Sequence, residues 1–130
     1  VCNILTEIEI PSSAHTIGEG LVDKCLSLKI VKNPPSVIVI GCAFIDCSSL
    51  ENINIPPSVK TIHHSAFRGC TSLKSIEIPD SVTRVGDCLF KNCTSLKDFK
   101  FLASVDKLGV SVFHGCTSLE KIDLPPITLI

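Results

Sequence analysis

The feature that most constrains the fold is a unit of 22 or 23 residues that recurs six times and opens each time with a cysteine. Successive openings are separated by 23, 22, 23, 23 and 23 residues, and they are Cys2, Cys25, Cys47, Cys70, Cys93 and Cys116. A repeat of this length is typical of solenoids, in which each unit forms one coil and stacks on the next. A single coil buries too little apolar surface to offset the cost of ordering its backbone, so the coils must fold as a stack.

Each unit carries a strand pattern. A leucine follows the cysteine after three places, and apolar residues follow at three and five places beyond it, as in Leu73, Ile76 and Ile78. This alternation predicts a strand, and a proline follows it in five of the six copies, where it ends the extended run. Four copies place a phenylalanine three residues before the next cysteine: Phe44, Phe67, Phe90 and Phe113. We therefore expect parallel strands, one per coil, over core columns of leucine, isoleucine and phenylalanine.

Two departures from the repeat predict local irregularity. The second copy is one residue short between Gly41 and Phe44, and Asn33 occupies one of its inward isoleucine positions. That coil should be the irregular one. His63 stands where other copies have glycine, and we interpret it as a residue that tolerates a positive φ better than most.

Composition excludes several classes of function. The formal net charge is -1, from 12 basic and 13 acidic residues, so no long-range field attracts nucleic acid. The longest apolar run, Val37 to Ile45, is too short to cross a bilayer, which predicts no membrane insertion in this fragment. We expect residues 1–130 to form a single array of about six coils that is truncated at both ends.

The unit C-[ST]-S-L-x-x-I-x-I-P-x-S-V-x-x-I-G-x-x-x-F-x-x-C resembles the BspA-like, or Treponema-type, leucine-rich repeat over essentially the whole chain. The resemblance implies a leucine-rich-repeat solenoid that is mainly β, with parallel strands stacked one per coil and joined by short turns or single helical turns. It also implies cell-surface or secreted proteins that adhere to host cells and extracellular-matrix proteins. It implies no catalysis and no cofactor, and it transfers no binding residue, because the ligand-reading positions are variable in the motif.

The cysteines allow three interpretations: a disulfide framework, a metal site or core packing. Zinc motifs need ligands two to four residues apart, whereas these cysteines recur once per coil. Coils about 4.8 Å apart would allow a disulfide by Cα separation, but side chains in register leave the Cβ atoms too far apart. We therefore favour small, buried residues that pack before each strand. Cys42 and Cys88 lie outside the series, and we expect them to be the more reactive thiols.

Other candidate chemistry is weak. His63 and His64 are adjacent and would face opposite ways in an extended segment, which favours a surface or turn role over a ligand role. Gly18-Glu19-Gly20 lacks the third glycine of a nucleotide loop. Asn92-Cys93-Thr94 fits an N-glycosylation acceptor, but Asn92 also fits the tight turn that other copies build with Asp46, Gly69 and Gly115.

The outward strand positions are the candidate binding residues. One column comprises Glu9, Lys32, Asn54, Glu77, Lys100 and Asp123, and the column beside it contains Glu7, Asn52, Ser75, Asp98 and Lys121. In register, Glu9 lies beside Lys32, and Lys100 lies between Glu77 and Asp123, which predicts pairs of opposite charge. These columns form either a solvated ladder of salt bridges or a protein-binding face on a concave sheet. The apolar residues Ile30, Ile38 and Val39 form a secondary candidate patch.

The sequence thus predicts a non-catalytic adhesion or protein-interaction solenoid at a cell surface or in secreted form. The expected partner is an extracellular-matrix or host surface protein. Because the chain has no Trp or Tyr to anchor an interface, we expect weak binding or binding through avidity. The alternative is a structural spacer, or an intracellular scaffold, without a ligand of its own.

Overall fold

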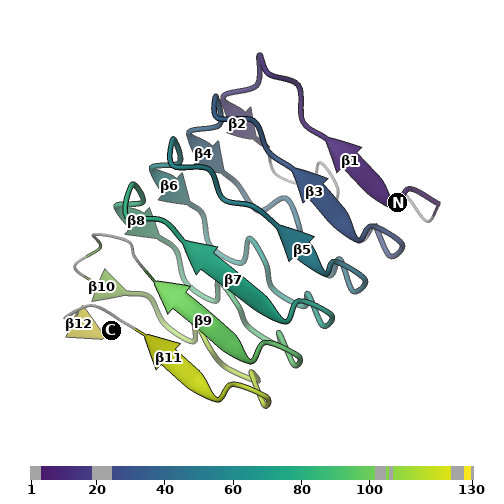
Figure 1. Ribbon diagram of the computed structural model, residues 1–130. Coiled ribbons are helices and arrows are strands. Elements are labelled where there is room, and N and C mark those ends of the chain that lie inside the picture. The colour runs from purple at the N-terminus through teal and green to yellow at the C-terminus, as the bar shows by residue number, and fades with distance from the viewer. Residues whose placement is uncertain (1–3, 19–24, 102–104, 106, 124–127, 130) are drawn as a thin grey trace.

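The computed structural model describes residues 4–18, 25–101, 105, 107–123 and 128–129, and these form a stack of coils with two short strands each (Figure 1). The first strands of the coils are β1 (Glu7–Glu9), β3 (Ile30–Lys32), β5 (Asn52–Ile53), β7 (Ser75–Ile78), β9 (Asp98–Phe101) and β11 (Lys121–Asp123). The second strands are β2 (Thr16–Ile17), β4 (Val39–Ile40), β6 (Thr61–Ile62), β8 (Arg84–Val85), β10 (Lys107–Leu108) and β12 (Thr128–Leu129). None of the described residues lies in a helix.

All strand pairs are parallel and join equivalent positions of neighbouring coils. The first strands form two sheets, β1-β3-β5 and β7-β9-β11, which together make what we call the first-strand face. The second strands form the sheets β2-β4-β6-β8 and β10-β12, which make the second-strand face. In register, Ile8 lies opposite Val31 and Ile76 lies opposite Phe99. The predicted leucine-rich-repeat solenoid is confirmed.

The core follows from the alternation of the first strands. In β7, Ser75 and Glu77 are exposed, whereas Ile76 and Ile78 are buried, as the sequence predicts. The leucine column is also buried, at Leu28, Leu50, Leu73 and Leu96. Both columns pack into one continuous cluster that extends from coil to coil, because every coil covers the apolar surface of its neighbour.

The phenylalanines stack along the axis of the solenoid. The ring centroids of Phe44 and Phe67 are 5.8 Å apart, as are those of Phe67 and Phe90, with interplanar angles of 4° and 10°. Phe113 continues the stack at 6.1 Å from Phe90. Phe99 packs its edge against the last two rings, with centroids 5.1 Å from Phe90 and 5.0 Å from Phe113. Such aromatic contacts stabilise by about 0.5–1.5 kcal/mol beyond the burial of area.

At Gly86 and Gly109 the glycine before the phenylalanine turn is needed for close approach between coils, and not for a positive φ. A Cβ atom on Gly86 would lie 2.6 Å from the Cα of His64 and 2.9 Å from the carbonyl carbon of His63. Neither Gly86 nor His63 is among the residues with positive φ, so the interpretation of His63 as a left-handed residue is wrong.

The shortened second coil is irregular at that turn, where a thiol replaces a backbone donor. In longer coils the N–H of Ser65 donates to Asp87 O (2.9 Å), and that of Cys88 donates to Val110 O (2.9 Å). The second coil has no residue at this position, and the Sγ of Cys42 donates to His64 O instead, at 2.8 Å. The strands of that coil, β3 and β4, still pair on both sides.

Candidate functional site

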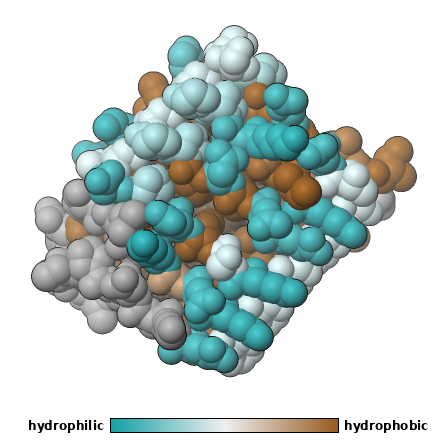
Figure 2. All heavy atoms as spheres, in the orientation of Figure 1, coloured by the Kyte–Doolittle hydropathy of each residue, from teal (hydrophilic) through white to brown (hydrophobic). Residues whose placement is uncertain are grey.

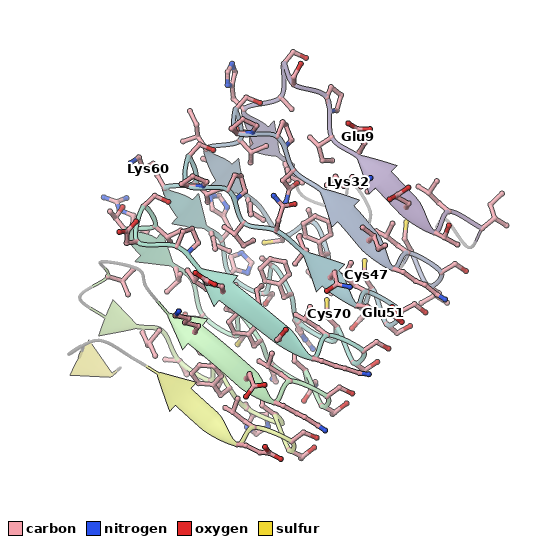
Figure 3. The ribbon with its side chains drawn as sticks, viewed as in Figure 1. Glu9, Lys32, Cys47, Glu51, Lys60 and Cys70 are labelled. Atoms are coloured by element: carbon pink, nitrogen blue, oxygen red, sulfur yellow. The ribbon has the colours of Figure 1, made fainter. Side chains whose placement is uncertain are left out.

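The cysteines that open the fourth, fifth and sixth coils each donate a thiol hydrogen bond to the phenylalanine carbonyl 26 residues earlier, and the Sγ of Cys70 does so to Phe44 O at 3.3 Å. The Sγ of Cys93 donates to Phe67 O at 3.0 Å, and the Sγ of Cys116 donates to Phe90 O at 3.1 Å. Phe90 O also accepts the backbone N–H of Cys93, at 3.0 Å. The predicted packing role is confirmed, since Cys25, Cys47, Cys70 and Cys93 are all buried. Figure 3 shows the sulfur atoms of Cys47 and Cys70 in successive coils, behind the first strands.

Sequence reasoning missed this hydrogen bond. The signal that could have revealed it is the constant separation of three residues between each phenylalanine and the following cysteine. The turn between them brings the phenylalanine carbonyl against the next coil, where a small side chain with a donor fits and an alanine would leave the carbonyl with one partner fewer.

Burial keeps these thiols protonated. It raises the pKa of Cys70 well above its usual value, and the neighbouring Cys93 and Cys47 raise it further. Burial, followed by the effect of Cys116, raises the pKa of Cys93 to about 12. Cys70, Cys88, Cys93 and Cys116 are free thiols, and no group of three or more His, Cys, Asp or Glu among the described residues could hold a metal ion. Cys70, Cys93 and Cys116 are therefore neutral hydrogen-bond donors.

The raised pKa of Cys93 predicts that stability declines in alkaline solution. In the unfolded chain a thiol ionises near pH 8.5, so its contribution is full below that pH and is lost as the pH rises through about 12. The free energy of unfolding should fall by at most about 1.4 kcal/mol per pH unit for each such thiol. Urea unfolding of the wild type and of Cys93→Ala between pH 7 and pH 11 tests this. The free energy of unfolding should fall less steeply with pH in Cys93→Ala than in the wild type. Equal pH dependence of the two proteins would contradict the prediction.

Of the two cysteines outside the series, Cys42 differs from the expectation of reactivity, whereas the reactivity of Cys88 stays a prediction. Cys42 is buried, and its thiol is engaged by His64 O, so its predicted reactivity is wrong. Both ring nitrogens of His64 also lie near this sulfur, at 3.6 and 3.7 Å. Cys88 is half-buried and adopts a φ of 57°, the conformation that Ser65 and Ser111 have at the same place in their coils.

Asn92 serves the tight turn, as the structural alternative predicts. It has a φ of 63°, and the equivalent residues of other coils are also left-handed, with φ of 58° at Asp46, 76° at Gly69 and 79° at Gly115. Asparagine, aspartate and glycine are the residues that adopt this conformation most readily. His63 and His64 are exposed, in agreement with the predicted surface role.

The structure brings the predicted binding residues together on the first-strand face. Ten of them lie in its strands: Glu7 and Glu9 in β1, Lys32 in β3, Asn52 in β5, Ser75 and Glu77 in β7, Asp98 and Lys100 in β9, and Lys121 and Asp123 in β11. Asn54 directly follows β5. The side chains of Lys121 and Asp123 lie outside the described part, and the other nine residues are exposed. Figure 2 shows this face as hydrophilic side chains with hydrophobic atoms exposed between them.

The ion pairs on this face differ from those expected. The predicted register is confirmed, with Glu9 opposite Lys32 and Lys100 between Glu77 and Asp123. Lys32 Nζ nevertheless contacts the diagonal neighbour Glu7, at 3.3 Å from Oε1, because a long side chain reaches beyond the residue directly opposite. Within the described part of the chain this is the one ion pair. It is solvent-exposed and contributes about 0–1 kcal/mol.

Asn54 uses its side chain for the backbone of the neighbouring coil. Its Oδ1 accepts the N–H of Asn33 at 3.1 Å, and its Nδ2 donates to Asn33 O at 3.3 Å. The Nδ2 of Asn33 donates in return to Asn54 O at 2.9 Å, while the buried Oδ1 of Asn33 has no partner among the described residues. The side chain of Asn54 therefore links the backbones of the second and third coils by hydrogen bonds.

A groove of about 410 Å³ lies across β5, β7 and β9 on this face. Its rim is formed by Asn52, Ser75, Glu77, Asp98 and Lys100, and at its base lie the half-buried Ile53 and the buried Ile76 and Phe99. All five rim residues are among those predicted from the outward columns. The groove itself is not predictable from the repeat pattern, because the residues at its base occupy ordinary core positions.

Comparisons with known proteins agree with this architecture. A family model described as the BspA type leucine-rich repeat region matches six copies, over residues 1–62 and 41–130. No curated protein matches the chain. A leucine-rich repeat protein from Bacteroides ovatus is 40% identical, with a TM-score of 0.83 over 88% of this chain and 30% of that one.

Two further solved structures are similar. A leucine-rich cell surface protein from Faecalibacterium prausnitzii is 26% identical, with a TM-score of 0.60 over 97% of this chain and 50% of that one. A leucine-rich repeat protein from T. pallidum is 25% identical, with a TM-score of 0.57 over 88% of this chain and 78% of that one. The chain thus spans 30% of the length of the Bacteroides protein and half that of the Faecalibacterium protein.

Proposed function

Because the chain belongs to the BspA-type leucine-rich-repeat family, we propose that it is a non-catalytic module of a cell-surface or secreted protein that binds a host or matrix protein through its first-strand face. Leucine-rich repeats are generally scaffolds for protein interaction, and stacked coils offer extended surfaces for it. The similarity to the Faecalibacterium cell surface protein supports the location. No helix within the described residues has the length and apolar character needed to cross a membrane.

The observation that carries the proposal is the shape and chemistry of one face. Eight predicted residues with exposed polar or charged side chains lie in successive first strands, and a groove opens among them beside the half-buried Ile53. Interfaces of this kind combine a desolvated apolar centre with a polar rim. Glu9 and Lys32 illustrate the arrangement, since they project from neighbouring strands of this face (Figure 3).

Binding should depend on the charges of the outward column. A variant with Glu9, Lys32, Glu77 and Lys100 all changed to alanine leaves the net charge unchanged, so it separates a specific surface from nonspecific attraction. We expect its retention on solubilised extracellular matrix to fall at least about tenfold, since loss of a few central contacts costs 1.4 kcal/mol or more. Surface plasmon resonance with immobilised matrix proteins measures this.

The matched control changes Lys60 and Glu120, which are exposed and lie outside the first strands, to alanine and is also neutral overall. It should bind as the wild type does. If the wild type and both variants bind alike, or none binds, the spacer alternative is favoured.

An intracellular scaffold is the second candidate, because Cys70, Cys88, Cys93 and Cys116 are free thiols, as is usual in reducing compartments. Surface labelling of intact cells that express the parent protein separates the two locations. A labelled protein supports surface display, and a protein that is labelled only after lysis supports the scaffold.

A further inference from the structure

The first-strand face is interrupted between the third and fourth coils. Strands β5 and β7 follow each other in the stack, yet no backbone hydrogen bond joins them, although every residue of both strands is described. On either side of this gap the ladders β3–β5 and β7–β9 are formed. The same two coils are also joined on the second-strand face, where Thr61 and Ile62 pair with Arg84 and Val85. The gap is therefore local to the first-strand face.

The gap leaves backbone polar groups without partners in the chain. Elsewhere the residue before each first strand donates to the preceding coil, as the N–H of Glu51 does to Lys29 O and that of Lys97 does to Lys74 O, both at 2.9 Å. The equivalent bond from Lys74 to Glu51 O is absent. Because Asn52 N–H bonds back to Lys29 O, alternation directs the N–H and C=O of Ile53 toward the gap. Such groups are stabilised only by a hydrogen-bond partner, which here must come from water or from a ligand.

The groove coincides with this gap. It takes Asn52 and Ile53 from β5, Ser75, Ile76 and Glu77 from β7, and Asp98, Phe99 and Lys100 from β9. Its volume of about 410 Å³ falls within the range of ligand pockets and is large enough for one apolar side chain with its backbone. Ser75, in the middle of the rim, has a small and exposed side chain.

The rim favours a cationic partner. It carries two carboxylates, Glu77 and Asp98, against a single ammonium group, Lys100. Although Glu77 and Lys100 are in register, no ion pair joins them, and Asp98 is in register with Lys121, whose side chain lies outside the described part. The carboxylate of Glu77, with Asp98 beside it, can therefore accept hydrogen bonds from a lysine or arginine of a ligand, and partial desolvation in the groove strengthens such contacts.

We propose that this groove binds an extended peptide segment of a partner protein, which places one apolar side chain against the half-buried Ile53 and a lysine or arginine beside Glu77 and Asp98. This site rests on the proposed function and specifies the chemistry of its partner. A peptide satisfies all three features of the groove, because its backbone supplies hydrogen bonds, its apolar side chain fills the hollow and its cationic side chain meets the rim.

Three fluorescein-labelled peptides test the site: GKVLVKG, the acidic counterpart GEVLVEG and the serine counterpart GKSSSKG. Fluorescence anisotropy should show that the first binds at least about tenfold more tightly than either counterpart, a difference of 1.4 kcal/mol. Backbone amide NMR shifts on titration should concentrate at Ile53, Ser75 and Glu77. Equal affinities for the three peptides, or shifts centred on the second-strand face, would overturn the proposal.

Two variants separate the apolar and the charged parts of the site. Ser75→Phe fills the hollow from an exposed position, and Glu77→Gln with Asp98→Asn removes the rim charge. Each variant should bind GKVLVKG with an affinity at least about tenfold lower than that of the wild type. Glu120→Gln is the matched control, since it removes an exposed carboxylate that lies outside the groove and outside the first strands, and it should leave the affinity unchanged.

The outcomes also distinguish the site from the general function. If Ser75→Phe keeps its circular dichroism spectrum and still binds GKVLVKG like the wild type, the site is wrong. If the peptides fail to bind but matrix retention is lost in the four-alanine variant, the function stands and the groove is not its centre. If matrix retention is also absent, the proposed function falls as well. Amide shifts that change with protein concentration alone would place a second copy of this chain in the groove and overturn the peptide proposal.

Discussion

Replacing Phe67 by alanine is expected to lower the free energy of unfolding by about 3–5 kcal/mol, the range for loss of a large aromatic side chain from a core. Phe67 is fully buried, and its ring stacks on Phe44 and on Phe90 at 5.8 Å on each side. The cavity left by the ring cannot collapse easily, because each neighbouring coil is held by its own strand ladders on the second-strand face. Domains of this size are stable by about 5–15 kcal/mol, so the substitution should remove a large fraction of the total stability.

Urea unfolding followed by circular dichroism measures the effect. Phe113→Ala is the matched control, since Phe113 is half-buried and contacts one ring of the stack, Phe90, together with the edge of Phe99. The free energy of unfolding should fall clearly less in Phe113→Ala than in Phe67→Ala. Equal costs at the two positions would show that the stack does not stabilise the array beyond burial of the individual rings.

Gly86→Ala is the second substitution with a large expected effect. The added methyl group would collide with the backbone of His63 and His64, which cannot rotate away as a side chain could. We expect the free energy of unfolding to fall by about 1–3 kcal/mol, as is usual for overpacking a dense interior. The thermal midpoint of the variant, measured by differential scanning calorimetry, should fall by several degrees.

Gly18→Ala provides a control at the same position of the repeat. Nothing lies within 4 Å of a Cβ atom built on Gly18, so the substitution should change stability by no more than about 0.5 kcal/mol. A large loss of stability in Gly18→Ala, or no loss in Gly86→Ala, would contradict the explanation by close approach. Backbone conformation would then be the better explanation for the glycine.

The repeat made most of the fold predictable. The spacing of Leu73, Ile76 and Ile78 identifies strand, core and face together, because a period of two residues leaves one choice of inward side chains. The register of the outward columns follows from the same count, and Glu9 does lie opposite Lys32. The ion pair of Lys32 with Glu7 could not be predicted from the residue spacing of the repeat, because it depends on the rotamer of a long, exposed side chain.

The candidate site was only partly predictable, for a different reason. The rim residues follow from alternation, but the break between β5 and β7 depends on small displacements of whole coils, which no pattern of residue types encodes. The copies around Ile53 and Ile76 read like their neighbours. The glycine position was misjudged because glycine is used both for positive φ and for close contact, and only the neighbouring coil decides between them.

The hydrogen bond from Cys42 has a practical consequence for the construction of artificial arrays. A module that lacks one residue usually shifts every later module out of phase, but here the phase is restored within the same turn, since β4 and β6 pair at Val39 with Thr61. A side chain that supplies the missing donor is enough to absorb the deletion. Modules of unequal length can therefore be joined in one array, provided that the shorter one carries a cysteine at this corner.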